Sequence, residues 1–215
     1  MDLLFLIIEA ILILFSIIAH EMAHAYMSFF LGDPTPKETG RLTPNPLKHL
    51  DIWGLIFMLV FRIGWAKPVR INSEYYKNRR VGIFLVALAG PLTNFIIFIV
   101  ALLLSVLVFK LNIDPNIKAI LFNILFILAS INISLCLFNL IPIPPLDGSR
   151  IVGSFLSANA YIGYMKVERY GFYIIMALLG LDSILAYARG ATPLFEKAIQ
   201  TIFYFFFDVI LKIFV

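Results

Sequence analysis

The sequence is short of cysteine and of charge, and both shortages narrow the kind of protein it can encode. Cys136 is the single cysteine among 215 residues, so the chain can form no intramolecular disulfide and shows no sign of an oxidising compartment. Charged residues make up 14% of the chain, below the roughly 25% of soluble domains. Because 61% of the residues are hydrophobic and the mean hydropathy is +0.96, we expect an integral membrane protein.

Three other features are missing. No basic region precedes the first apolar segment, which is also too long for a signal peptide, so we expect no cleavable leader. The sequence has no repeats, no low-complexity segments and no room for an appended soluble domain. The net charge of +4 is modest, so it fits basic loops beside lipid head groups and does not indicate a nucleic-acid partner.

Long apolar runs dominate what remains, and a bilayer-crossing helix needs about 20 apolar residues. Five runs qualify: Leu3–Leu31, Val81–Phe109, Ala119–Ile141, Tyr170–Ala188 and Phe195–Val215. A sixth, Ile52–Ile63, is too short to cross, so we expect a re-entrant or interfacial helix there. The predicted fold class is therefore an all-α membrane protein with about five transmembrane helices.

Residues 32–80 form the major polar region, with nine basic and four acidic side chains. If five spans cross the bilayer with the N-terminus outside, this region and the 142–169 loop lie on one side. That side carries 13 of the 17 Lys and Arg residues, counting Lys212. By the positive-inside rule it is cytoplasmic, so we expect a multi-pass protein of the cell membrane.

Prolines shape the expectations for the polar region. Those in Asp33–Pro36 and Thr43–Pro46 lead us to expect no helix at either place. Trp65–Ile71 is predicted to be a small extended segment, with an edge strand as the alternative. Such an edge beside a catalytic site could hold a peptide substrate as a further strand.

The most informative motif is His20-Glu21-Met22-Ala23-His24, which lies inside the first apolar run. Residues four apart share one face of a helix, so both imidazoles can bind one metal ion. Glu21 can reach a water molecule at that metal and act as general base, as in zinc metalloproteases. The alternative is that these side chains only form hydrogen bonds between helices. We favour the metal site, because burying three polar groups in a span is costly without compensation.

A catalytic zinc ion needs three protein ligands and an open position for water. Asp147 is the strongest candidate for the third ligand, because it follows three prolines that interrupt an apolar span. Irregular backbone at membrane depth is tolerated where it lines a cavity, and it can turn a carboxylate inward. The alternative is an ordinary exposed turn. Weaker candidates are His49, which we expect to be solvated or at the membrane interface, and the acids Glu9, Asp182 and Asp208.

Four further segments, read together with the zinc motif, resemble a known family. They are Gly40-Arg41-Leu42-Thr43, Gly64-Trp65-Ala66-Lys67-Pro68-Val69, Ala89-Gly90-Pro91-Leu92-Thr93-Asn94 and the run from Asn139 to Gly148 that ends in Pro-Leu-Asp-Gly. The combination is similar to the site-2 proteases of bacteria and archaea, and within them to compact members without PDZ or CBS modules. The resemblance covers residues 16–153, and the last two apolar runs carry nothing diagnostic.

The resemblance implies one integral membrane protease domain over residues 1–215, with a catalytic core at 3–153 and C-terminal helices at 170–215. It implies that one Zn²⁺ is bound by the residues His20, His24 and Asp147, with Glu21 as the catalytic base.

The resemblance also implies that Asn94 and Asn139 lie at the active site, where they bind substrate backbone or stabilise the oxyanion. The residues alone leave open that either asparagine is a hydrogen bond between helices. Likewise, the same His and carboxylate ligands also accept divalent ions other than zinc.

The expected reaction is hydrolysis of a peptide bond within or near a transmembrane segment of a membrane-protein substrate. Water would reach the site from the cytoplasm, and the substrate needs some unwound backbone because a regular helix hides its carbonyls. A divalent-metal transporter and an inactive relative that binds membrane segments remain as alternatives. Acids gathered toward one side disfavour the transporter, and the intact zinc motif disfavours the inactive relative.

Overall fold

The structure, a computed structural model, describes residues 3–49, 51, 67 and 69–214. It divides into two compact units, Met1–Ile96 and Ile97–Val215. The described residues form helices and connecting turns, and no strand occurs among them, which confirms the all-α fold class. The edge-strand alternative therefore finds no support at positions 67 and 69–71, while the short helix predicted at 52–63 lies outside the described residues.

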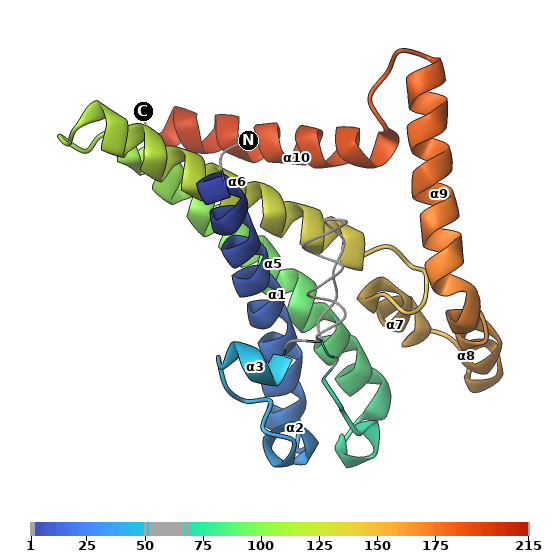
Figure 1. Ribbon diagram of the computed structural model, residues 1–215. Coiled ribbons are helices and arrows are strands. Elements are labelled where there is room, and N and C mark those ends of the chain that lie inside the picture. The colour runs from blue at the N-terminus through green and yellow to red at the C-terminus, as the bar shows by residue number, and fades with distance from the viewer. Residues whose placement is uncertain (1–2, 50, 52–66, 68, 215) are drawn as a thin grey trace. The chain divides into compact units, whose positions relative to one another are not determined.

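The first unit is built on one long helix, α1 (Leu3–Phe30), shown in blue in Figure 1. It also contains the one-turn helices α2 (Thr35–Glu38) and α3 (Pro46–His49), the 3-10 turn η1 (Ser73–Tyr75) and the first part of α5 (Arg79–Val108). α1 ends where Gly32 takes a positive φ of 101°, a conformation that glycine adopts without strain. Pro34, two residues farther on, also prevents the helix from continuing.

α2 and α3 show that the expectation of no helix at the proline pairs was wrong. In α2, Pro36 occupies the first turn, and α3 begins at Pro46. A proline there loses no helical hydrogen bond, because the first N–H groups of a helix have no partner within it. Both helices contact α1, so the polar region folds back onto the zinc-motif helix.

Asp33 organises the polar region from a fully buried position. Its Oδ1 accepts from the Thr35 N–H (2.9 Å), and its Oδ2 accepts from the Ser28 hydroxyl (2.7 Å) and the Asn72 N–H (2.7 Å). Burial alone would raise the pKa of Asp33, but the hydrogen bonds from these three residues outweigh it. The pKa of Asp33 therefore lies below its ordinary value of 3.8.

A second buried group, Arg41, holds the middle of the polar region. Its guanidinium donates to the carbonyl oxygens of Lys48 and of Lys67, the latter at 3.2 Å. His49 is also fully buried, and its Nε2–H donates to the Thr43 carbonyl (2.7 Å). The expectation of a solvated His49 was therefore wrong, because this ring packs inside the loop and bonds to its backbone.

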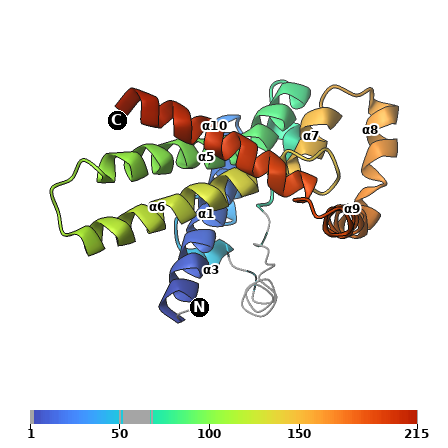
Figure 2. The ribbon, with the colours of Figure 1, turned by 90° about the horizontal axis from the view of Figure 1, so that it is seen from above.

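The second unit contains the rest of α5 and five further helices. They are α6 (Pro115–Asn139), α7 (Asp147–Gly153), α8 (Ala158–Met165), α9 (Glu168–Ala188) and α10 (Leu194–Phe214). Next to the turn that joins them, α5 and α6 run side by side (Figure 2). Asp114 caps α6 by accepting from the Asn116 N–H, and Pro115 fills the first helical position, as the predicted turn requires.

Aromatic side chains form much of the contact between α10 and its neighbours in this unit. The ring of Phe203 lies 4.6 Å from Phe126 of α6 and 5.7 Å from Phe98 of α5, measured between centroids. Phe206 and Phe207 extend the same contact along α10. Such aromatic pairs stabilise a contact beyond the burial of apolar area alone, so the aromatic face of α10 holds this helix against α6 and the second-unit part of α5.

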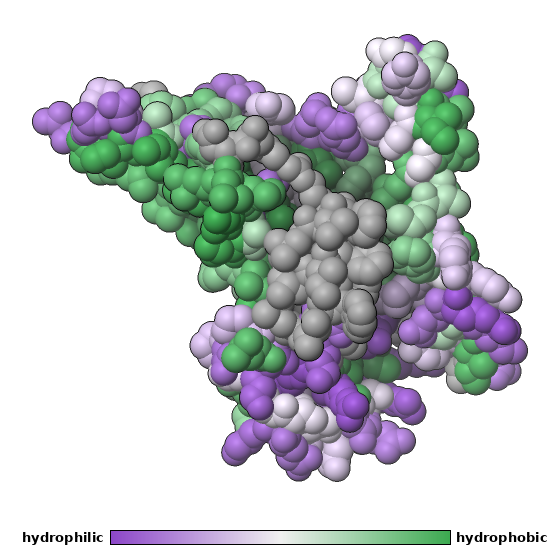
Figure 3. All heavy atoms as spheres, viewed as in Figure 1, coloured by the Kyte–Doolittle hydropathy of each residue, from purple (hydrophilic) through white to green (hydrophobic). Residues whose placement is uncertain are grey.

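Among the described residues, four helices are long and apolar enough to cross a membrane: α1, α5, α6 and α9. α10 is a helix at the predicted position, but it is not among them, because it carries four charged residues within its 21 positions. The predicted span at Phe195–Val215 is therefore not supported, and the described part of the chain has four candidate spans. In Figure 3 the exposed side of α1 is mostly hydrophobic, whereas hydrophilic residues gather around α2 and α3.

The Asp33 cluster gives a pH-dependent prediction. Because the folded pKa of Asp33 is lowered, its carboxylate stabilises the fold fully above the ordinary pKa of 3.8, and this stabilisation is lost as pH falls through the folded value. We expect Asp33→Asn to destabilise the protein by about 1–3 kcal/mol at pH 7 and by less below pH 4. Thermal unfolding in detergent measures this difference. Glu38→Gln, at an exposed acid nearby, is the control and should change little.

Candidate metal centre

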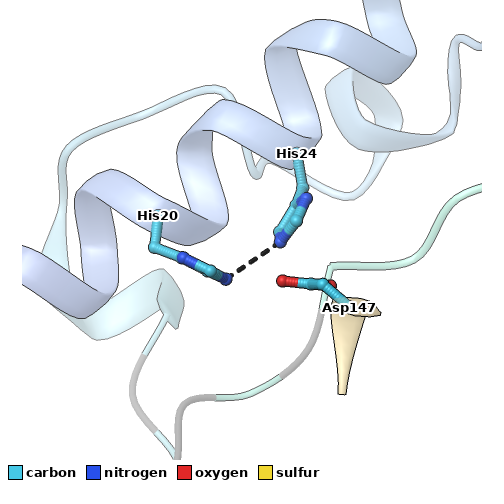
Figure 4. Close-up of side chains that lie close together, drawn as sticks. All are labelled: His20, His24 and Asp147. Atoms are coloured by element: carbon cyan, nitrogen blue, oxygen red, sulfur yellow. Dashed lines mark hydrogen bonds between the residues drawn. The ribbon is translucent and has the colours of Figure 1, made fainter. Parts of the chain in front are cut away.

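His20 and His24 lie on adjacent turns of α1 and point toward each other (Figure 4). Their Nε2 atoms are 3.0 Å apart, and the ring planes are nearly perpendicular at 85°. Both side chains are buried, with exposed fractions of 6% and 9%. The four-residue spacing of the motif therefore brings two imidazole nitrogens to one point, as predicted.

The second nitrogen of each ring fixes which atom carries the proton. His24 Nδ1 lies 2.7 Å from the Val86 carbonyl oxygen, which can only accept a hydrogen bond. His20 Nδ1 lies 2.6 Å from Asn94 Oδ1. The amide of Asn94 is oriented by its Nδ2, which donates to the Ser16 carbonyl (3.4 Å), so its oxygen faces His20. Each Nδ1 is therefore a donor.

With Nδ1 protonated, a neutral imidazole presents a lone pair on Nε2. Two such lone pairs at 3.0 Å repel each other unless a proton or a cation lies between or beside them. Histidine ligands of metals in proteins are oriented in this way by a hydrogen bond from the other ring nitrogen. The two histidines thus fit a zinc ion in tautomer and in direction.

Three positions of α5, each four residues from the next, face the two histidines. Val86 contacts His24 and Asn94 contacts His20, and Gly90 lies between them. A Cβ atom built on Gly90 would lie 2.5–2.6 Å from the imidazole atoms of both rings, closer than real side chains approach. Glycine is therefore required at position 90 by the close approach of the two rings to the backbone of α5.

Glu21 follows the first histidine and is half-buried. Its Oε2 accepts a hydrogen bond from the Val69 N–H at 3.2 Å. One carboxylate oxygen is thereby bound to the backbone of the polar region, and Oε1 is the oxygen that can take up a proton from a water molecule.

Asp147, the third residue labelled in Figure 4, belongs to the second unit and is the first residue of α7. The turn before it is held from two helices. The Tyr164 hydroxyl of α8 donates to the Pro142 carbonyl (2.6 Å), and Gly171 of α9 approaches the Pro144 carbonyl so closely that a Cβ would collide with it. Gly148 likewise approaches the Leu140 carbonyl. The backbone around Asp147 is therefore closely fixed.

The other sequence candidates fall into different roles. Asn139 lies at the C-terminal end of α6, where its Nδ2 donates to the Leu135 carbonyl of the same helix (3.0 Å). The Asp182 carboxylate caps α10 by accepting from the Leu194 N–H (3.0 Å) and the Phe195 N–H (3.1 Å), which is a structural role. His49 packs within the polar loop and is not brought to His20 or His24 by any described contact.

Gly90 and Val86 were missed from the sequence. The spacing of four between Gly90 and Asn94, equal to that of the two histidines, is a signal that could have found the glycine. Val86 contributes only its backbone oxygen, so nothing in its side chain could have indicated the contact.

The close approach at Gly90 leads to a prediction on metal affinity. Gly90→Ala should displace one or both imidazoles and weaken zinc binding by about tenfold or more, because metal ligands tolerate displacements of only about 0.2 Å. Zinc titration of the purified protein measures this. Gly180→Ala is a matched control, since that helical glycine has open space around its Cβ. Equal zinc affinity in both variants would contradict the assignment of Gly90.

Comparison with known proteins gives the family. Peptidase family M50 matches over residues 106–181. The "Putative zinc metalloprotease YwhC" of Bacillus subtilis (strain 168) is 38% identical over 170 residues, which cover 78% of this chain and 78% of that protein. "Zinc metalloprotease MJ0392" of Methanocaldococcus jannaschii is 32% identical over 180 residues, 81% of this chain but 43% of that protein. No solved structure matches. The resemblance to the site-2 proteases is thereby confirmed, and the chain belongs to peptidase family M50.

Proposed function

We propose that this chain hydrolyses peptide bonds with one zinc ion held by His20, His24 and Asp147, and with Glu21 as the general base. The class of reaction follows from the family: a member of peptidase family M50 is an intramembrane zinc metalloprotease. The relatives carry metalloprotease names, which favours the peptidase over the metal transporter. The single observation that carries the proposed site is the convergence of two oriented Nε2 atoms.

Asp147 is proposed as the third ligand on chemical grounds. A catalytic zinc ion takes three protein ligands and keeps one open position, and two histidines with one carboxylate are a known set. Asp147 supplies a carboxylate at the start of α7, on a turn held by Tyr164 and Gly171. A fixed backbone supports this role, because ligand side chains must be held within a fraction of an ångström.

Zinc, when bound, acidifies a water molecule and polarises the carbonyl of the peptide bond. Glu21 Oε1 accepts a proton from the attacking water, while Val69 keeps Oε2 in place. The water oxygen bonds to the carbonyl carbon, the C–N bond breaks, and Glu21 returns the proton to the leaving amine nitrogen. His20 and His24 keep their Nδ1 protons throughout and donate them to Asn94 Oδ1 and to the Val86 carbonyl oxygen.

The two asparagines are assigned different roles in this proposal. Asn94 acts through His20, because its Oδ1 holds that ring. Asn139 remains a candidate for binding the substrate backbone: its Nδ2 donates to its own helix, and its Oδ1 can accept from a substrate N–H.

The family implies membrane-protein substrates and a lipid environment, and the chain is a multi-pass membrane protein. We propose the cell membrane as its location and the cytoplasm as the side from which water enters. With four spans, the 32–80 and 142–169 loops still lie on one side, since α5 and α6 separate them. These loops hold nine and three of the 17 Lys and Arg residues, so the positive-inside argument does not depend on α10.

Replacing the general base tests the reaction. Glu21→Gln should lower the rate of cleavage of single-pass membrane segments by at least about 100-fold, while bound zinc measured in the purified protein stays near that of the wild type. Glu196→Gln, at an exposed acid of α10, is the control. Full cleavage by Glu21→Gln would rule out the proposed mechanism.

Replacing the proposed third ligand tests the metal site by a measurement independent of cleavage. Asp147→Ala should weaken zinc binding by more than the roughly 10- to 100-fold that loss of a supporting hydrogen bond causes. Asp208→Ala removes an exposed carboxylate of α10 and should bind zinc as the wild type does. If both variants bind zinc with unchanged affinity, Asp147 is not a ligand.

A further inference from the structure

The segment Val69–Asn72 is attached to the α1 region at both of its ends. At one end the Val69 N–H donates to Glu21 Oε2 (3.2 Å). At the other end the Asn72 N–H donates to Asp33 Oδ2 (2.7 Å). Three residues of chain reach at most about 10 Å, so the anchor at Asn72 limits how far Val69 can move. The hydrogen bond from Asp33 to Asn72 therefore restrains the backbone that supplies the hydrogen bond to Glu21.

Asp33 is itself held rigidly. The Ser28 hydroxyl has a single proton, which it donates to Asp33 (2.7 Å), so the Tyr76 hydroxyl must donate to Ser28 Oγ (2.7 Å). The Thr35 N–H binds the other carboxylate oxygen (2.9 Å). Tyr76 in turn packs against Gly82 at the start of α5, where a Cβ would overlap its ring. The carboxylate is thus fixed by α1, α2 and, through Tyr76, by α5.

A buried carboxylate is costly unless all its partners are well placed. Capping the turn after α1 would occupy one oxygen of Asp33, through Thr35, and would not require burial. The second oxygen instead binds a backbone N–H 39 residues farther along the chain. A residue that only caps a local turn does not need this bond to Asn72. Asn72 is three residues along the chain from Val69, which contacts Glu21.

The chain just before Val69 is held by hydrogen bonds that do not involve Asp33. The Lys67 N–H donates to the His49 carbonyl (2.8 Å), and the Lys67 carbonyl accepts from Arg41 (3.2 Å). Removing the Asp33 carboxylate therefore releases Asn72 while Lys67 keeps its bonds. The imidazoles keep theirs as well, because their partners Val86 and Asn94 lie on α5.

We propose that Asp33 is a positioning residue for the catalytic base: by holding Asn72, it keeps the Val69 N–H on Glu21 Oε2 and so directs Oε1 toward the water. The consequence for catalysis rests on the proposed function. The structural linkage from Asp33 to Val69 does not, so the two can be tested apart.

The linkage is tested by amide hydrogen exchange at Val69 and Asn72 in the full chain. In Asp33→Ala, exchange should accelerate at least tenfold at both amides. In Glu21→Ala it should accelerate at Val69 alone, because Asp33 still holds Asn72. Asp114→Ala is the matched control: it also removes a carboxylate that accepts backbone N–H groups, but at the start of α6, and it should change neither amide. Unchanged exchange at Val69 in Asp33→Ala would overturn the proposal.

The catalytic consequence is tested by cleavage kinetics with bound zinc measured in parallel. Asp33→Ala should lower kcat by about 10- to 100-fold, with KM within about twofold and bound zinc unchanged, because only the base is misplaced. Asp33→Asn keeps one acceptor oxygen, so its kcat should lie between those of Asp33→Ala and the wild type. The same variant replaces Asp33→Ala in the test if the alanine variant does not fold. Loss of zinc together with kcat would assign Asp33 a general structural role and overturn the proposal.

Failure of the proposed function gives a different pattern. In that case wild type cleaves no membrane segment, or Glu21→Gln cleaves normally, while exchange at Val69 still responds to Glu21→Ala. One set of variants therefore distinguishes failure of the positioning role of Asp33 from failure of the proposed peptidase function.

Discussion

The hydrogen bonds from the two Nδ1 atoms to α5 are the constraint on which the rest of the site depends. Two imidazoles on one helix face can rotate freely about their side-chain bonds, and spacing alone brings them only near each other. The Val86 carbonyl and the Asn94 amide remove that freedom and choose the tautomer of each ring. In the proposed metal site, the two rings would be oriented before a cation binds, which would lower the entropy lost on binding.

The main helices and the zinc motif could be predicted from the sequence because each depends on local pattern. Apolar runs place α1, α5, α6 and α9 within a few residues of their observed ends, and the Asp114-Pro115 turn separates α5 from α6 as expected. The spacing of His20 and His24 predicts their common direction. In each case the relevant contacts span no more than a few residues, so periodicity and turn chemistry carry the information.

What could not be predicted depends on contacts between distant segments. Position 90 must be glycine because the imidazoles of another helix lie against it. In the sequence, Asp33 is indistinguishable from an ordinary turn residue, and its bond to the distant Asn72 N–H is visible only in the structure. His49 was expected to be solvated or interfacial but is buried within the loop, where the neighbouring Lys48 carbonyl accepts from the Arg41 guanidinium. The prolines of the polar region were misjudged for a simpler reason, since a first-turn proline is compatible with a short helix.

The contact between Gly171 and the Pro144 carbonyl links the turn before the proposed ligand Asp147 to α9. The segment carrying Asp147 leans on α9, a helix with no zinc-binding pattern of its own, and the M50 match likewise extends to residue 181. α9 therefore supports the turn before Asp147, and it is also long and apolar enough to cross a membrane. The smallest piece able to preserve the geometry of that turn must include it, well beyond Gly153.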